Sequence, residues 1–297
     1  MHQEKSVGYR FAMLLLLMIA GAMLGYIIAL ASIPLVFQIP FSALMGVLNM
    51  DSGLEITPAV LKYVQLILAT FVFIVPANAY SHLFSDNTFV FFEFKKPSLV
   101  FLFFAALLWL FTLPIISFLA DINNKIAFPT SFAGLENSFR LAEARAENAT
   151  RFLLNITSVS GLMVNLLVIA VVAAIAEELI FRGIIQKLLF EQSKNIHLAI
   201  WLTALVFSLF HLQFFAIIPR IVLGAALGYT FYWSKSIWVP IFFHFINNAS
   251  IVLASYLYQQ KVITTDPNEI TFFPNSVLFV AFICSIAIIY FWIKRAK

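Results

Sequence analysis

Long apolar runs separated by short polar stretches dominate the chain from residue 11 almost to its end. About 20 consecutive apolar residues are enough for a helix to cross a bilayer. The pattern predicts an all-α, polytopic membrane bundle of about eight spanning helices. Their expected ranges are 11–37, 60–80, 98–120, 158–191, 197–212, 215–233, 237–258 and 276–293.

The segment 121–157 breaks this pattern, because it is the longest stretch without a spanning run. Within it, residues 135–153 have the periodicity of an amphipathic surface helix. Two charged pairs at i,i+4 spacing support that helix, Glu136 with Arg140 and Glu147 with Arg151. We expect an extramembrane loop whose helix is solvated or lies at the interface. The alternative is a lid that controls access for a substrate.

Composition agrees with a membrane protein. The chain has 297 residues, of which 62% are hydrophobic and 11% charged, whereas soluble domains are about 25% charged. We expect residues 1–297 to form a single membrane domain. One cysteine, Cys284, excludes a disulfide framework and a CxxC redox pair.

The distribution of positive charge predicts the orientation. Eight spans would bring both termini to the same side, and most lysines and arginines then fall there. The positive-inside rule makes that side cytoplasmic. The net charge of +4 thus reflects topology, and we expect no nucleic-acid partner. The predicted location is the plasma or inner membrane, in a bacterial cell.

Three charged residues stand out, Glu177, Glu178 and Arg182, because residues 158–176 before them carry no charge. A charge at the centre of a bilayer costs about 2.5–3.5 kcal/mol on insertion scales, so intramembrane ionisable groups indicate a functional site by default. Glu178 and Arg182 have i,i+4 spacing and are expected to form an ion pair. Glu177 would remain available for chemistry.

Two further polar motifs follow within the apolar region. Phe207 precedes His211 by four residues, and His244 precedes Asn248 by the same interval. If the chain turns back near residues 193–195, Glu177 and His211 each lie 17 residues from Lys194. At 1.5 Å per residue, both would sit about 25 Å from that turn and face each other.

His244 fits this picture less well, because only eight residues separate it from Ser236. It is expected to lie nearer the cytoplasmic face than Glu177. Two arrangements would bring His244 to the depth of Glu177 and His211. In one, the hairpin that turns near residues 193–195 extends beyond the membrane, and in the other, residues 213–219 follow a re-entrant path.

These groups suit hydrolysis of an amide. A carboxylate and an imidazole can activate a shared water, and a second imidazole with an amide can stabilise an oxyanion. Glu177, His211 and His244 could instead hold a metal ion such as zinc. Other readings are a transporter that relays protons or cations, a non-catalytic scaffold or immunity protein, and haem bound by two histidines.

In their order and residue types, the three motifs EExxxR, FxxxH and HxxxN resemble the signature of the CPBP family, the CAAX proteases and bacteriocin-processing enzymes also called Abi. The resemblance covers residues 158–258, the expected catalytic core. It implies an intramembrane endopeptidase similar to type II CAAX prenyl endopeptidase, whose substrate is a peptide or a membrane protein. By this likeness Glu177 and His211 activate water, and His244 and Asn248 form the oxyanion hole. The remaining motif residues, Glu178, Arg182 and Phe207, would support the site.

The family is commonly named a metalloprotease, but the sequence contains no HExxH motif that would indicate zinc independently. A bacteriocin leader, a signal peptide and a membrane-protein tail all remain open as substrates.

Overall fold

The computed structural model describes residues 5–40, 57–267 and 273–295. Every regular element within these residues is a helix, which confirms the all-α class. In the described part of the chain, seven helical runs are long and apolar enough to cross a bilayer, so the chain is a polytopic integral membrane protein. They are α1 (Val7–Phe37), α3–η1–α4 (Pro58–Phe84), α6 (Leu99–Asn124), α8–η3–α9–η4–α10 (Val159–Ser193), η5–α12 (Phe214–Ser234), α13 (Trp238–Gln259) and α14 (Asn275–Arg295).

The fifth of the eight expected spans is present as a shorter apolar helix, α11 (Ile196–Phe210). Its 15 residues extend about 22 Å, less than the roughly 30 Å of a hydrocarbon core. The helix stops because Leu212 adopts a left-handed backbone with a φ of 54°. The short helix η5 (Phe214–Ala216) then leads into α12 (Ile217–Ser234). This early stop places His211 in a turn at the end of α11.

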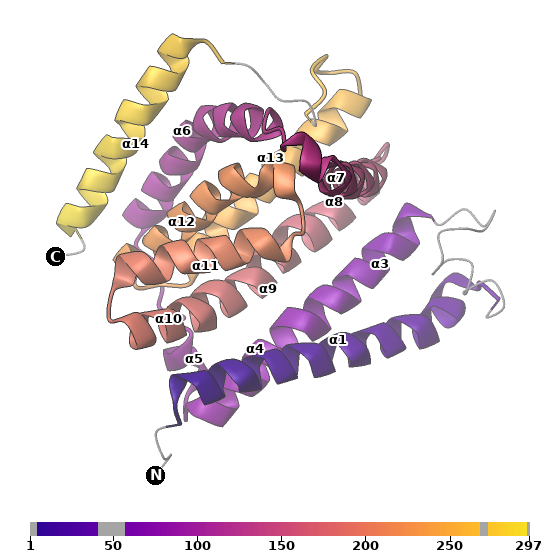
Figure 1. Cartoon of the computed structure of the whole chain (residues 1–297). Coiled ribbons are helices and arrows are strands. Elements are labelled where there is room, and N and C mark those ends of the chain that lie inside the picture. The colour runs from indigo at the N-terminus through magenta and orange to yellow at the C-terminus, as the bar shows by residue number, and fades with distance from the viewer. Residues whose placement is uncertain (1–4, 41–56, 268–272, 296–297) are drawn as a thin grey trace.

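The helix that carries the acid pair, α9 (Ala173–Ile180), packs against α13 on one side and η1 (Thr70–Ile74) on the other. In Figure 1, α14 lies at the outer edge beside α6, while α1 and α3 (Pro58–Ala69) form the opposite edge. The fold also contains the short helix α5 (Thr88–Phe91) and the amphipathic helix α7 (Ala133–Leu153), which is not among the candidate spans. The candidate site therefore lies inside the bundle.

Helix α1 begins and α14 ends at the same end of the bundle (Figure 1). Arg10 of α1 pairs there with Glu191 of α10 (Gln186–Ser193). Lys187 pairs with Glu93 at 3.1 Å, and Ser236 donates to the Lys95 carbonyl at 2.6 Å. Which face of the membrane this end occupies stays a prediction from the positive-inside rule.

Three π-helical segments interrupt the spanning helices, and two of them flank α9. They are η1, η3 (Leu166–Val172) and η4 (Phe181–Ile185). π-Helical turns are rare and are frequent at functional sites, because they shift the hydrogen-bond ladder by one residue. Here the acid pair lies on a short α-helical stretch between two such turns.

Gly21 and Gly25 of α1 form a packing face, as their GxxxG spacing predicts. A Cβ built on Gly21 would lie 1.9 Å from the Phe71 carbonyl oxygen, and one on Gly25 would lie 2.8 Å from Phe71 Cβ. The backbones of α1 and η1 can therefore approach this closely only because Gly21 and Gly25 lack side chains.

Gly21→Ala is expected to destabilise the protein by about 1–3 kcal/mol, the usual cost of overpacking. Gly8→Ala is the matched control, because nothing lies within 4 Å of a Cβ at Gly8 in the same helix. Thermal unfolding of both variants in one detergent measures the difference. Equal melting temperatures for the two variants would contradict the close approach of α1 and η1.

Candidate active site

The predicted pair of Glu178 and Arg182 is present and completely buried. Arg182 Nη1 donates to Glu178 Oε1 at 2.7 Å, and Arg182 Nη2 donates to the Gly224 carbonyl at 2.9 Å. A buried charge needs such partners, because desolvation of an isolated ion costs several kcal/mol. The pair joins the acidic helix α9 to α12.

A second hydrogen bond repeats this connection one turn further along. Gln186 Nε2 donates to the Gly228 carbonyl at 3.2 Å, so side chains four apart on one helix reach carbonyls four apart on α12. A Cβ at Gly228 would lie 2.8 Å from Gln186 Oε1. Gly228 thus makes room for the Gln186 side chain, whereas a Cβ at Gly224 would lie 3.1 Å from Ala204. Sequence reasoning missed Gln186, although its i,i+4 spacing from Arg182 was a usable signal.

His244 also contacts the acid pair. Its Nδ1 donates to Glu178 Oε1 at 2.8 Å, and only 4% of the residue is exposed. Glu178 therefore accepts from both Arg182 and His244, whereas the sequence indicated only the arginine. The expected displacement of His244 toward the cytoplasmic face is wrong.

The start of α13 explains the level of His244. Ile237 donates its N–H to the Glu93 carbonyl at 3.2 Å, and the Glu93 side chain also binds Lys187. Helix α13 therefore begins at the level of Lys187 and not at the level of the turn at Lys194. Glu178 lies roughly 10–14 Å from Lys187 along its helix, and His244 lies roughly the same distance from the start of α13. The loop before α6 thus sets the depth of the site, and hydropathy alone could not show it.

Glu177 faces the other nitrogen of His244. Glu177 Oε2 lies 3.9 Å from His244 Nε2, and the carboxylate side chain is 20% exposed. Glu177 Oε2 is buried and has no hydrogen-bond partner in the described part of the chain. A polar contact beyond 3.5 Å is the distance at which a bridging water fits. This carboxylate oxygen therefore has an unused capacity to accept a hydrogen bond.

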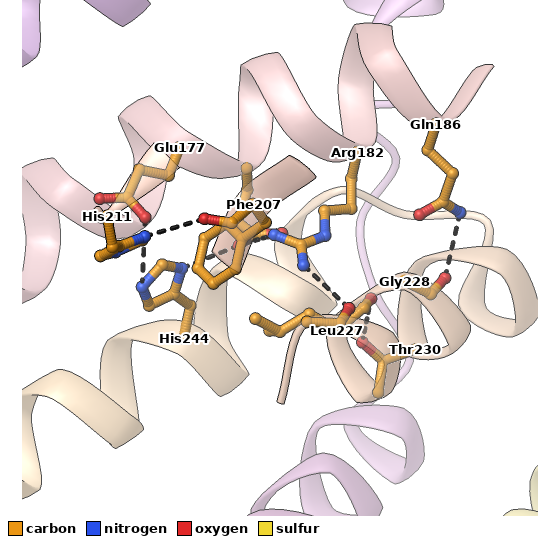
Figure 2. Close-up of polar contacts among 11 residues, drawn as sticks. Glu177, Arg182, Gln186, Phe207, His211, Leu227, Gly228, Thr230 and His244 are labelled. Atoms are coloured by element: carbon orange, nitrogen blue, oxygen red, sulfur yellow. Dashed lines mark hydrogen bonds and ion pairs between the residues drawn. The ribbon is translucent and has the colours of Figure 1, made fainter. Parts of the chain in front are cut away.

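His211 is held by its own helix. Its Nδ1 lies 2.9 Å from the Phe207 carbonyl oxygen, which can only accept, so Nδ1 carries the proton and Nε2 keeps its lone pair. Figure 2 shows Glu177, His211 and His244 grouped on one side of the Phe207 ring, with Arg182 on the other. In the described residues no direct hydrogen bond joins Glu177 to His211.

Phe207 lies between the ion pair and the histidines. Its ring centroid is 5.0 Å from that of His211 and 6.0 Å from that of His244, and Arg182 Cζ lies 4.9 Å from it. The ring limits the orientations open to both imidazoles and contacts the guanidinium by a cation–π interaction.

Asn248 lies one turn beyond His244 on α13. Its Nδ2 donates to the Ile169 carbonyl in η3 at 3.0 Å, and its Oδ1 accepts from Asn247 at 3.2 Å. Its amide thereby ties α13 to a π-helical turn. The oxyanion role expected from the resemblance stays a prediction.

The residues expected to hold zinc are Glu177, His211 and His244. Among residues 5–40, 57–267 and 273–295, no group of three His, Cys, Asp or Glu side chains is arranged as a metal site. His244 Nδ1 is bonded to Glu178 and His211 Nδ1 to a carbonyl, which is also the usual arrangement when the second ring nitrogen serves as a ligand. The zinc set therefore stays a prediction, and the reaction proposed for the site uses no metal.

Helix α7 covers the turn next to His211. Glu143 accepts from Phe215 N–H at 3.2 Å and from Gln213 Nε2 at 3.4 Å, while Gln213 Oε1 accepts from Arg220 at 2.7 Å. The Phe139 and Phe214 rings stack with centroids 5.2 Å apart. This contact supports the lid interpretation of the amphipathic helix. Sequence reasoning missed the chain of polar contacts, since only the fold brings these distant segments together.

Glu143→Ala is expected to loosen α7 from residues 213–216, because two donors lose their acceptor. Amide hydrogen exchange in α7 and in that turn should accelerate by about fivefold to tenfold, as loss of about 1 kcal/mol predicts. Glu147→Ala, an exposed position on the same helix, is the control and should leave exchange in residues 213–216 unchanged.

The same contact is expected to depend on pH. Burial raises the pKa of Glu143 above its ordinary value of 4.5, against the opposing effects of the Phe215 N–H and Arg220, while Glu147 adds to the rise. The docked helix binds the proton more tightly than an undocked one, so docking weakens as the pH rises above 4.5. Exchange that slows with rising pH, after correction for its intrinsic rate, would contradict this sign.

The fold and site define a class, a helical membrane protein with a buried acid–arginine pair and two imidazoles beside a free carboxylate. Residues 159–250 match the family described as type II CAAX prenyl endopeptidase Rce1-like. The chain is also 31% identical over 144 residues to a Bacillus subtilis (strain 168) protein named "Putative membrane peptidase YdiL". No solved structure matches.

These matches confirm the resemblance to the CPBP family for the segment that carries the three motifs. The Bacillus alignment covers 45% of this chain and 56% of that protein, so the chain matches little more than half of its relative's length. The relative also agrees with the expected bacterial source.

Proposed function

We propose that this protein is an intramembrane endopeptidase that hydrolyses a peptide bond with water held between Glu177 and His211. The observation that carries the proposal is the buried Glu177 Oε2, which lacks a hydrogen-bond partner in the described residues and lies 3.9 Å from His244 Nε2, with His211 on the same side of the Phe207 ring (Figure 2). An unpaired acceptor in a dry interior is costly, and a bound water would satisfy it.

In the proposed reaction, Glu177 acts as general base. It removes a proton from the water while the water oxygen bonds to the carbonyl carbon of the substrate. The second hydrogen of that water stays on its oxygen and donates a hydrogen bond to His211 Nε2. This bond orients the water, because His211 Nδ1 is fixed on the Phe207 carbonyl. When the carbon–nitrogen bond breaks, Glu177 returns the proton to the leaving amine. The reaction thus consumes one water and needs no other reactant.

His244 and Asn248 would stabilise the oxyanion. In its protonated form His244 can donate from Nε2 because Nδ1 is engaged by Glu178, and the pair of Glu178 and Arg182 orients the ring from behind. Asn248 would use the amide hydrogen that is not bonded to Ile169. Donors aimed at a developing oxyanion are each worth about 10²–10³ in rate.

The likeness to a membrane peptidase supports the reaction class, and the apolar surroundings of the site support a substrate in or at the membrane. The substrate class is therefore a peptide or a membrane protein.

Cleaved termini in host membranes test the proposal. Membranes that contain the wild-type protein, Glu177→Ala, His211→Ala or His244→Ala are compared for new protein N- and C-termini by mass spectrometry. We expect termini that require the wild-type protein and disappear in all three variants at equal protein abundance. Termini that persist in all three would contradict the proposal. Ion flux through proteoliposomes that requires Glu177 without cleavage would instead support a transporter.

A further inference from the structure

A cleft of about 550 Å³ lies between the start of α3 and the start of α8 (Val159–Asn165), apart from the proposed catalytic groups. It lies at the end of the bundle opposite the chain termini (Figure 1). Its volume falls within the 300–1,000 Å³ range of small-molecule sites. Three of the residues on its apolar walls are Leu66, Val164 and Val168.

The cleft also has polar lining residues. Asn155, Thr157, Ser158 and Ser160 line it where the chain leaves α7 and enters α8. The cleft therefore combines apolar walls with hydroxyl and amide groups. A molecule that fills it should have an apolar chain and a polar head.

Lys62 lines this cleft and is only 8% exposed. Among the described residues, its ammonium group has no hydrogen bond or ion pair. Most of the side chain is covered, but Lys62 Nζ is not among the buried atoms without a partner, so the ammonium group is accessible from the cleft. The cleft thus presents a positive charge that an anion can reach.

The geometry points to a bound anionic phospholipid. We propose that the phosphate of this lipid pairs with Lys62. The polar residues that line the cleft contact the headgroup, and an acyl chain lies along Leu66, Val164 and Val168. Lys62 lies five residues after the cap Thr57, about 7 Å below the helix start, a depth that suits a headgroup near the interface. The proposal does not depend on the peptidase reaction.

Native mass spectrometry of the delipidated full-length protein in detergent tests the site. Phosphatidylglycerol and inorganic phosphate are titrated separately against the wild-type protein, Lys62→Met and Lys125→Met. Lys125 is the matched control, because it is an exposed lysine near the same end of the bundle. We expect phosphatidylglycerol to bind Lys62→Met at least tenfold more weakly than it binds the wild-type protein or Lys125→Met.

Inorganic phosphate is expected not to displace the lipid at millimolar concentration, because the acyl chain contributes to binding. Displacement would show a simple anion site and overturn the proposal, as would equal lipid affinity for the wild-type protein and Lys62→Met. Two variants guard against misfolding of Lys62→Met. Lys62→Arg should keep the lipid, whereas Val164→Phe should weaken its binding by narrowing the cleft while Lys62 remains.

Discussion

Glu177→Gln is expected to lower the cleavage rate of an identified substrate by about 10²–10⁴-fold, the usual contribution of a general base. The amide has nearly the same shape but cannot accept the proton of the water. Because Glu177 Oε2 has no hydrogen-bond partner in the described residues, the substitution should not lower the unfolding temperature. Active sites commonly sacrifice stability in this way. Rates and melting curves of the purified protein, measured in one detergent, provide both numbers.

Glu191→Gln is the control for this prediction. Glu191 pairs with Arg10 at the end of the bundle where the termini lie, and a partly exposed ion pair contributes little to stability. Its cleavage rate should stay within twofold of the wild-type rate. If Glu177→Gln cleaved at the wild-type rate, or lost activity only in proportion to a lower melting temperature, the general-base role would be refuted.

Arg182→Met should destabilise the protein by about 3–5 kcal/mol, because it leaves the carboxylate of Glu178 buried without its cation. Both side chains have an exposed fraction of 0%, so water cannot compensate. The double variant Glu178→Leu/Arg182→Met leaves neither charge behind and should lose less stability than the two single variants added together. Equilibrium unfolding of all four proteins gives the coupling energy.

Cleavage separates the two roles of Glu178. The double variant should remain inactive even where it is stable, because His244 has lost the acceptor for Nδ1. Strictly additive free energies of unfolding would contradict a directly coupled pair. Activity in a stable double variant would show that Glu178 does not orient His244.

Local spacing was sufficient for the helices and for the pair of Glu178 and Arg182. The predicted helix at 135–153 is present as α7, and the fourth span continues through α10 to Ser193 as expected. Hydropathy is a property of consecutive residues, and i,i+4 contacts lie within one helix. Neither depends on how the helices pack. The length of α11 is the exception, because its end depends on a left-handed turn at Leu212.

Contacts between distant segments could not be read in this way. The link from Glu143 through Gln213 to Arg220 joins α7 to the turn before α12, and Lys62 meets a cleft that α8 completes. In the sequence alone, each of these residues resembles an ordinary polar or charged residue at a surface or a helix end. Only their burial and their partners show otherwise.

By itself, the sequence determined a membrane bundle and three polar motifs that belong together, because inserting charges into lipid is costly enough to mark them. The tertiary structure decided how the motifs meet. It tied Glu178 to His244 as well as to Arg182, left Glu177 Oε2 without a hydrogen-bond partner among the described residues, and set the level of α13 through the loop at Glu93. Depth and partner choice depend on packing between helices, and packing is a property of the whole bundle.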